Sequence, residues 1–156
     1  MDDLEQLYND LIMEHSMNSY NKKKLDSHDY EELGHNPSCG DEITLELKVK
    51  DRIIEDMAFS GHGCAISQAS TSIMIDTLKG KTIIEAKEII DTFIKMIKRE
   101  ITEGDPRLDK LEDAQAFINI SHMPARVKCA LLAWHTLDDM IEKNKLNGTA
   151  EINACH

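Results

Sequence analysis

Cysteine thiols and one nearby carboxylate are the groups in this sequence that could do chemistry. The 156 residues include four cysteines, Cys39, Cys64, Cys129 and Cys155, and Asp41 follows the first of them by two positions. Cys64 comes directly after the glycine-flanked turn at residues 61–63, where a helix is expected to begin. At a helix N-terminus the helix dipole and unpaired N–H groups stabilise a thiolate, which binds metal ions and attacks sulfur. The alternative is a buried cysteine that packs as a small apolar residue.

Four of these residues, Cys39, Asp41, Cys64 and Cys129, make a candidate ligand set for a metal ion. Three thiolates and one carboxylate in a tetrahedron suit Zn²⁺, and thiolates favour zinc or an iron–sulfur cluster over magnesium or calcium. The spacing alone leaves a second interpretation open, because the sequence lacks the paired Cys-x₂₋₄-Cys knuckles of structural zinc fingers. In that interpretation one thiol is reactive and the other two cysteines belong to the core.

Asp41 also has two explanations. An aspartate that follows a glycine at the start of a strand is most often a turn or cap residue. Its candidacy as a ligand depends on the two-residue spacing from Cys39, because side chains at positions i and i+2 of an extended segment share one face.

Several further residues are weaker candidates. Arg126 and Cys129 are three residues apart on an expected helix, so they lie on one side of it. Arg126 is either a solvated surface residue, or a cation that offsets a negatively charged metal centre or holds an anionic group of a partner. We interpret Cys155 as a tail thiol without a function. Three histidines are interpreted as turn or loop residues: His35, His62 and His122.

A β-hairpin is expected to position the first ligands. Apolar and polar residues alternate over 42–49, and a short turn leads into a second extended segment over 53–60. In an antiparallel hairpin, the start of the first strand and the end of the second are neighbours. The hairpin therefore brings Cys39 and Asp41 close to Cys64.

Helices are expected over most of the remaining chain. Their predicted ranges are 2–17, 64–80, 82–101, 107–119 and a last helix that begins at Pro124. Thr82 and Glu85 match a capping box at the start of the third of these helices. The segment 18–36 is predicted to be a loop that could include a short edge strand. We expect a single domain over 1–156, with an N-terminal helix and loop over 1–35 and a flexible tail over 145–156.

Composition and charge exclude several classes of protein. The 18 lysines and arginines against 29 aspartates and glutamates give a net charge of −11. Nucleic acids and anionic membrane surfaces require a basic footprint, so neither is an expected partner. No apolar run approaches the ~20 residues of a membrane-spanning helix, and the acidic N-terminus is unlike a secretory signal. We therefore expect a cytoplasmic protein, whose cysteines serve as thiols or metal ligands and not as disulfides.

Four motifs in this order resemble those of the IscU/NifU N-terminal iron–sulfur scaffold family, most closely its SufU branch. The motifs are residues 36–41 (NPSCGD), 61–67 (GHGCAIS), 78–81 (LKGK) and 124–134 (PARVKCALLAW). Two features favour the SufU branch. Lys128 occupies the position where IscU-type scaffolds have histidine, and the connection between Gly80 and Cys129 is longer than in those scaffolds.

The resemblance implies an α+β fold in which a small three-stranded antiparallel sheet is packed on one side by about five helices. It also implies zinc at Cys39, Asp41, Cys64 and Cys129. The implied activity is that of a zinc-dependent sulfurtransferase, which accepts persulfide sulfur on Cys39 from a cysteine desulfurase, a SufS-type pyridoxal-phosphate enzyme. Arg126 matches an arginine of the family.

An alternative function uses the same ligands to assemble a [2Fe–2S] cluster, with other iron–sulfur assembly proteins as partners. An unrelated zinc hydrolase or deaminase is ranked lower, because neither His-Glu-x-x-His nor a deaminase signature is found in the sequence. A purely structural zinc site is the fourth interpretation.

Overall fold

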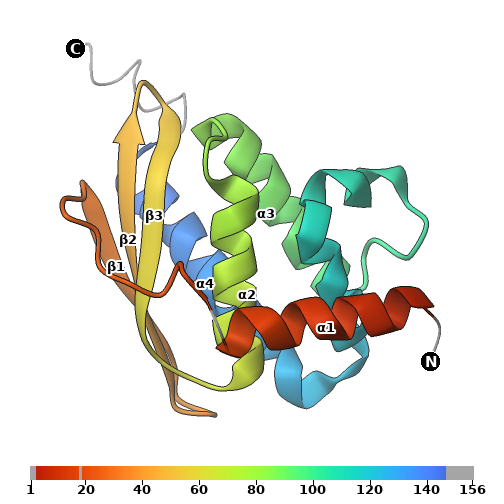
Figure 1. Cartoon of the computed structure of the whole chain (residues 1–156). Helices are drawn as coiled ribbons and strands as arrows, with labels where there is room; N and C mark the ends of the chain where they lie inside the picture. The colour runs from red at the N-terminus through yellow and green to blue at the C-terminus, as the bar shows by residue number, and fades with distance from the viewer. Residues whose placement is uncertain (1–2, 18, 147–156) are drawn as a thin grey trace.

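The computed structural model describes residues 3–17 and 19–146. One layer is a three-stranded antiparallel sheet in the order β1-β2-β3, with strands β1 (Tyr30–Asn36), β2 (Asp41–Lys50) and β3 (Ile53–His62). Figure 1 shows the helices on one side of this sheet. They are α1 (Asp3–Met17), α2 (Ala65–Leu78), α3 (Ile83–Ile97), the 3₁₀ helix η1 (Pro106–His122) and α4 (Pro124–Lys143). The predicted α+β fold is confirmed.

The hairpin formed by β2 and β3 matches the expected one and sets which face is buried. Ile43, Leu45 and Leu47 are fully buried on the helix side of β2, which accounts for the alternation in the sequence. At the turn, Asp51 and Arg52 both have positive φ angles, 52° and 65°, as tight two-residue hairpin turns require. Because Glu42 pairs with His62, the start of β2 lies beside the end of β3.

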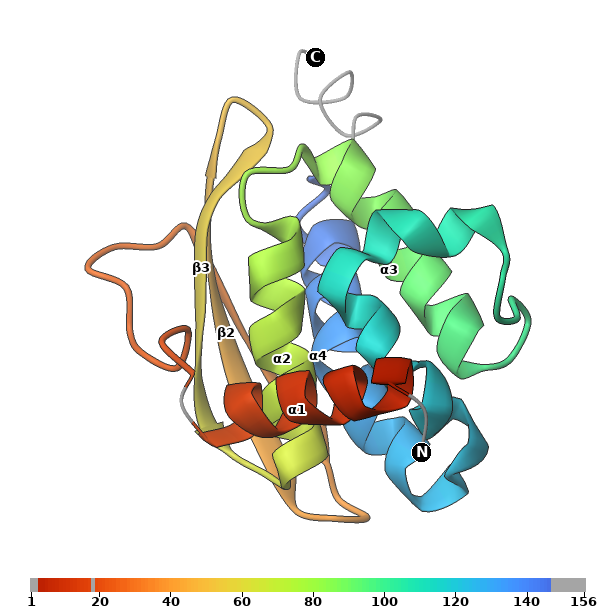
Figure 2. The same ribbon diagram turned by 45° about the vertical axis from the view of Figure 1, so that its right-hand side comes forward.

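The edge strand that the sequence allowed within 18–36 is present as β1, which pairs with β2 from Tyr30 to Asn36. Gly34 of β1 lies against α4, where an added Cβ would be 2.1 Å from Thr136 Oγ1. A glycine is therefore needed for this strand to approach the helix. The segment 19–29 crosses the face of the sheet opposite the helices, as Figures 1 and 2 both show.

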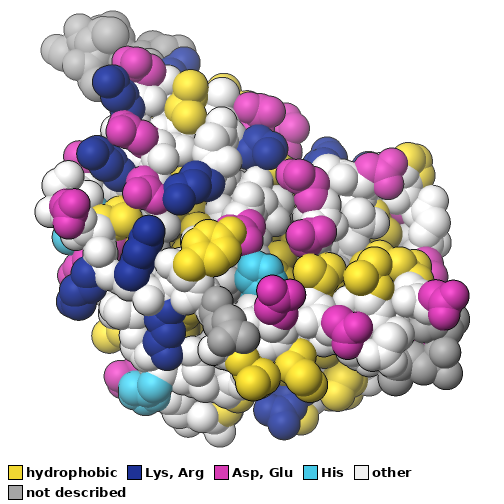
Figure 3. Space-filling view, in the orientation of Figure 1, with side chains coloured by type: hydrophobic (Ala, Val, Ile, Leu, Met, Phe, Trp, Pro, Cys, Tyr) yellow, Lys and Arg dark blue, Asp and Glu magenta, His cyan; other side chains and the backbone are white. Residues whose placement is uncertain are grey.

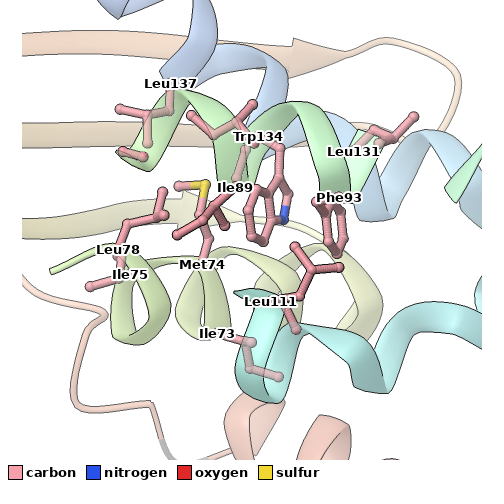
Figure 4. Close-up of a cluster of buried hydrophobic side chains, with 14 of the residues drawn as sticks. Ile73, Met74, Ile75, Leu78, Ile89, Phe93, Leu111, Leu131, Trp134 and Leu137 are labelled. Atoms are coloured by element: carbon pink, nitrogen blue, oxygen red, sulfur yellow. The ribbon is translucent and has the colours of Figure 1, made fainter. Parts of the chain in front are cut away.

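The centre of the core is an aromatic cluster between α3, η1 and α4. The ring centroids of Phe93 and Trp134 are 3.9 Å apart with nearly parallel planes, and Phe117 meets Phe93 edge-on at 6.0 Å. Aliphatic and methionine side chains surround this cluster, as Figure 4 shows. A polar link crosses the core: Trp134 Nε1–H donates to Ser70 Oγ at 2.9 Å, and Ser70 donates to the carbonyl of Ala130 at 2.6 Å.

Two predicted helices differ from the observed ones. The helix expected to reach residue 101 ends at Ile97, because Arg99 adopts a positive φ of 65° and turns the chain. Ile101 is still buried, although it lies beyond the helix. The helix expected over 107–119 is the 3₁₀ helix η1, which is interrupted at Glu112. Five of its seven buried residues are spaced three apart, the period of a 3₁₀ helix, and the other two are Ala116 and Ser121. The five are Leu108, Leu111, Ala114, Phe117 and Ile120.

The N-terminal helix lies on the surface of the helical layer. α1 has no fully buried residue, and Leu4 and Leu7 are exposed. Figure 3 shows hydrophobic side chains on both sides of α1 at this surface. Polar contacts to α2 attach its C-terminal end, including His15 Nδ1 to Ser72 Oγ at 2.8 Å. Just after the helix, Tyr20 Oη donates to Asp76 at 2.8 Å.

Two further sequence expectations concern the end of the chain and membranes. Lys145 and Leu146 belong to the predicted flexible tail, and Leu146 N–H donates to the carbonyl of Ile141 at 2.9 Å. The rest of the predicted tail, 147–156, lies outside the described residues and includes Cys155. Within the described residues, none of the helices has both the length and the apolar character needed to cross a membrane.

The predicted capping box of α3 is present and gives a first testable prediction. Thr82 Oγ1 accepts the N–H of Glu85, and Glu85 accepts the N–H of Thr82, each at 3.1 Å. Thr82→Ala is expected to lower the free energy of unfolding by about 1 kcal/mol, because the Glu85 N–H loses its acceptor. Urea denaturation measures this loss. Thr82→Ser keeps the acceptor and should retain most of the stability, so equal losses in the two variants would contradict the assignment.

Candidate metal centre

The turn between β1 and β2 presents the first two candidate ligands. Asn36 organises this turn, because its carbonyl accepts the N–H of Gly40 at 2.9 Å and its side chain accepts the N–H of Ser38 at 3.2 Å. Gly40 has a φ of 73°, which a glycine adopts without strain. The turn leaves Cys39 exposed and places the Asp41 side chain in the interior.

Thiols from three separate elements converge on the Asp41 carboxylate. Cys39 Sγ is 2.9 Å from Asp41 Oδ2 and 3.5 Å from Cys129 Sγ. These three donor atoms all lie within 4.8 Å of one another. Cys64 Sγ lies 3.9 Å from Asp41 Oδ2. Three of the four candidate ligands therefore form one close group, and the fourth, Cys64, lies beside it next to Asp41.

Asp41 is placed for both of the roles that the sequence left as alternatives. Its Oδ1 accepts the backbone N–H of Cys64 at 2.9 Å, which is the role of a turn or cap residue. Its Oδ2 is turned to the thiols of Cys39 and Cys64. Gly63 makes this arrangement possible, since a Cβ at that position would lie 2.8 Å from Asp41 Oδ1. The backbone hydrogen bond thus orients the carboxylate toward the centre.

Cys64 is the N-cap residue of α2, as predicted, and its side chain accepts the N–H of Ser67 at 3.4 Å. Its sulfur therefore lies at the N-terminal end of α2. The Ser67 hydroxyl is buried and has no hydrogen-bond partner within the described part of the chain. A buried polar atom without a partner is costly, so this hydroxyl is available to a group bound at the centre.

Cys129 lies on α4 and is almost completely buried. Burial raises the pKa of its thiol, and the neighbouring thiols of Cys39 and Cys64 raise it further. A thiol in this environment stays protonated unless a cation stabilises its charged form. A metal ion at the centre would supply that stabilisation.

The donor set fits zinc in both chemistry and spacing. With Zn–S bonds of about 2.3 Å, two thiolates of a tetrahedral site lie about 3.8 Å apart. The sulfur atoms of Cys39 and Cys129 are 3.5 Å apart, so a shift of a few tenths of an ångström would suffice. The same thiolates also suit an iron–sulfur cluster.

The remaining sequence candidates lie outside this cluster. Arg126 is exposed at the start of α4, and its side chain forms no hydrogen bond or ion pair with the described residues. His35 and His62 flank Glu42, at 3.9 and 3.6 Å, and none of the three belongs to the cysteine centre. Within the described residues, no hydrogen bond or ion pair joins His122 to the cysteine centre.

Sequence reasoning missed a chain of hydrogen bonds that supports the Gly63 turn. Gln68 Nε2 donates to the carbonyl of Gly63 at 2.9 Å, and Lys22 Nζ donates to Gln68 Oε1 at 2.8 Å. The sequence did offer one sign of this contact. Gln68 follows Cys64 by four residues, about one helical turn, so its side chain could be expected near the start of α2. The partner Lys22 carries no local signal, because 46 residues separate it from Gln68.

The close approach of Gly63 to Asp41 gives a second prediction. Gly63→Ala is expected to weaken zinc binding by at least about tenfold, because the new methyl group displaces the carboxylate from its oriented position. Competition with a chelator of known affinity measures the change. Gly104→Ala is the control: its Cβ meets nothing within 4 Å, although a φ of 92° strains the backbone. An equal loss of zinc affinity in both variants would contradict the role of Gly63.

The amino-acid sequence matches a known protein family over almost the whole chain. The NifU-like N terminal domain family matches residues 7–147. The chain belongs to this family. The resemblance noted in the cysteine motifs is therefore confirmed.

Curated members of the family carry two kinds of name. The iron–sulfur cluster assembly scaffold protein IscU of Thermotoga maritima is 40% identical over 138 residues, which cover 88% of this chain and 94% of that protein. The zinc-dependent sulfurtransferase SufU of Bacillus subtilis is 39% identical over 142 residues, which cover 91% of this chain and 94% of that protein. The similarity is almost equal, so identity alone does not choose between the two functions.

Solved structures share the fold. A Fervidobacterium islandicum protein, described as an iron–sulfur cluster assembly scaffold for the SUF system, superposes with a TM-score of 0.79 at 38% identity. The match covers 87% of this chain and 97% of that one. The N-terminal part of a NifU-like protein from Brucella abortus has a TM-score of 0.76 at 27% identity, over 89% and 94% of the two chains. The sheet and helix arrangement described above is thus shared by a SufU-type and a NifU-like member of the family.

Proposed function

We propose that this protein serves iron–sulfur cluster assembly as a zinc-dependent sulfur acceptor, which takes sulfur from a cysteine desulfurase onto Cys39. The observation that carries the proposal is the unequal accessibility of three clustered thiols. Cys39 is exposed, Cys64 is partly exposed and Cys129 is buried, although all three approach the same carboxylate. An incoming persulfide can reach Cys39 first. The sulfurtransferase name of the Bacillus subtilis relative supports this assignment.

Transfer onto Cys39 requires no external oxidant or reductant. The Cys39 sulfur attacks the terminal sulfur of a persulfide on the partner enzyme, and a new S–S bond forms at Cys39. The S–S bond of the partner breaks, and its cysteine leaves as a thiolate that takes up the proton lost by Cys39. Asp41 Oδ2 lies 2.9 Å from Cys39 Sγ and accepts the hydrogen bond of this thiol when Cys39 is not bound to a metal ion, so it can orient the free sulfur before attack.

The other residues of the centre have supporting roles. Cys64, Cys129 and Asp41 would hold the zinc ion together with Cys39. When bound, zinc supplies positive charge that stabilises the thiolate forms of its ligands. Arg126 is exposed at the start of α4, where it would be able to contact an anionic group of the desulfurase. The free thiols fit a reducing compartment, and we propose that the protein acts in the cytoplasm.

Metal and sulfur content test this function directly. Protein purified without oxygen should contain one tightly bound zinc ion per chain by elemental analysis. With cysteine and a pyridoxal-phosphate-dependent desulfurase, the protein should stimulate sulfide release and gain the mass of one sulfur atom on the peptide that contains Cys39. A zinc-loaded protein that neither stimulates the desulfurase nor gains sulfur would instead have a structural zinc site.

A second function, assembly of a [2Fe–2S] cluster on the same four residues, is favoured by the scaffold name of the Thermotoga maritima relative. The same thiolates suit iron as well as zinc. In that case anaerobic protein supplied with iron and sulfide should become coloured, and the chromophore should release sulfide in acid. A colourless protein that keeps its zinc under these conditions would argue against the scaffold function.

A further inference from the structure

A second group of metal-ligating side chains lies on the face of the sheet opposite the helices. Glu31 of β1 and Glu46 of β2 are direct partners in the antiparallel register, so two carboxylates stand side by side. Like charges placed directly opposite each other on neighbouring strands destabilise a sheet. His28, from the segment that crosses this face, lies between them, with Nε2 3.6 Å from Glu31 Oε1 and Nδ1 3.5 Å from Glu46 Oε2.

The burial of Glu46 makes this arrangement costly. Only 6% of its side chain is exposed, and a buried carboxylate requires compensation by hydrogen bonds and positive charge. The backbone N–H of Leu25 donates to Glu46 Oε1 at 2.7 Å. Among the described residues, Glu46 has His28 as its ion-pair partner and no lysine or arginine. Its second oxygen, Oε2, therefore depends on His28 alone.

His28 cannot serve both carboxylates as a neutral group. A neutral imidazole carries one N–H, so it donates to one carboxylate and presents a lone pair to the other. Two carboxylates and one imidazole nitrogen are instead a good donor set for a divalent cation. One ligand atom from each residue lies within 4.8 Å of the others, which is close enough for a shared ion after small side-chain rotations.

We infer that His28, Glu31 and Glu46 form a second divalent cation site, separate from the cysteine centre. The mixed nitrogen and oxygen donors suit manganese, iron(II) or zinc, with water in the remaining positions. The Leu25 N–H orients the Glu46 carboxylate in the way that outer hydrogen bonds orient metal ligands in general. The site does not depend on the sulfur chemistry proposed above.

Cation binding would fasten the segment 19–29 to the sheet. The ligands come from this segment and from two strands, so the ion links three pieces of backbone. The same segment pairs with β3, where Lys23 N–H donates to the carbonyl of Phe59 at 2.9 Å. It also carries Lys22, whose contact with Gln68 supports the Gly63 turn of the cysteine centre. An ion at this second site therefore holds in place a segment that reaches the first.

Manganese is the probe that separates the two sites, because thiolates favour softer ions. Zinc-loaded protein is titrated with Mn²⁺, and electron paramagnetic resonance measures the free ion. The wild-type chain is expected to bind one Mn²⁺. His28→Asn and Glu31→Gln each remove one ligand from an exposed position, and each should weaken binding by at least about tenfold. Bound Mn²⁺ should also slow amide hydrogen exchange over residues 22–29 in the wild-type protein.

Glu55→Gln is the matched control, since Glu55 is an exposed glutamate on the neighbouring strand β3 and lies outside the cluster. This variant should bind Mn²⁺ as the wild type does. Circular dichroism verifies that all variants are folded. The inference is overturned if the wild-type protein binds no Mn²⁺ at about 1 mM. It is equally overturned if His28→Asn and Glu31→Gln bind Mn²⁺ with unchanged affinity.

Discussion

Replacement of Cys39 with serine is expected to reduce sulfur acceptance from a cysteine desulfurase by at least about a thousandfold, the scale of loss when a nucleophile is removed. A serine hydroxyl cannot form a persulfide, and the other two clustered thiols are less accessible than Cys39. Mass spectrometry of the protein after incubation with desulfurase and cysteine measures the loss. Cys64, Cys129 and Asp41 remain in this variant, so part of its zinc should be retained.

Cys155→Ser is the control for this experiment. Cys155 lies outside the described residues and is predicted to have no role, so its replacement should leave sulfur acceptance unchanged. If the Cys39→Ser variant accepts sulfur at the normal rate, Cys39 is not the acceptor. If only the Cys155→Ser variant fails, the tail thiol has a function that the sequence interpretation missed.

Replacement of Trp134 with alanine is expected to lower the free energy of unfolding by about 3–5 kcal/mol, the usual cost of removing a large aromatic side chain from a core. Trp134 is fully buried and stacks on Phe93 with ring centroids 3.9 Å apart. It also donates to Ser70, which links α2 to α4 through the carbonyl of Ala130. Because α2 and α4 carry Cys64 and Cys129 at or near their first turns, zinc affinity should fall in the same variant.

The variant Trp134→Phe distinguishes the contribution of ring packing to stability from that of the hydrogen bond. Phenylalanine keeps an aromatic face against Phe93 and loses the indole N–H that donates to Ser70. The expected loss is about 1–2 kcal/mol, from a small cavity and one missing hydrogen bond. Denaturant unfolding followed by circular dichroism measures both variants. Similar losses for alanine and phenylalanine would mean that the hydrogen bond, and not ring packing, accounts for the contribution of Trp134.

The cysteine centre depends on three independent supports. The β2–β3 hairpin brings Asp41 beside Cys64, and the N-terminus of α2 fixes the position of the Cys64 sulfur through the Ser67 N–H. The packing of α4 then places Cys129 within 3.5 Å of Cys39. Each support can be removed by a different substitution, so the predicted effects on zinc affinity and on sulfur transfer can be separated.

The sequence by itself determined the features that arise from short-range physics. Alternation of apolar residues over 42–49 specified which side of β2 faces the core, because the side-chain period of a strand is two. Thr82 and Glu85 specified the start of α3, since a capping box is formed by residues three positions apart. The position of Cys64 at the N-cap of α2 followed from the glycines before it in the same local way.

The tertiary structure decided what depends on contacts between distant segments. Cys129 and Cys39 are 90 residues apart in the chain, and the packing of α4 against α2 and the sheet brings them together. The 3₁₀ form of η1 was not expected, because the sequence indicated only a helix over these residues. The register of β1 and β2 places Glu46 opposite Glu31, and the segment 19–29, which crosses this face of the sheet, covers Glu46. Local periodicity encodes neither the approach of Cys129 to Cys39 nor the burial of Glu46, since both depend on surfaces that form only when separate elements pack.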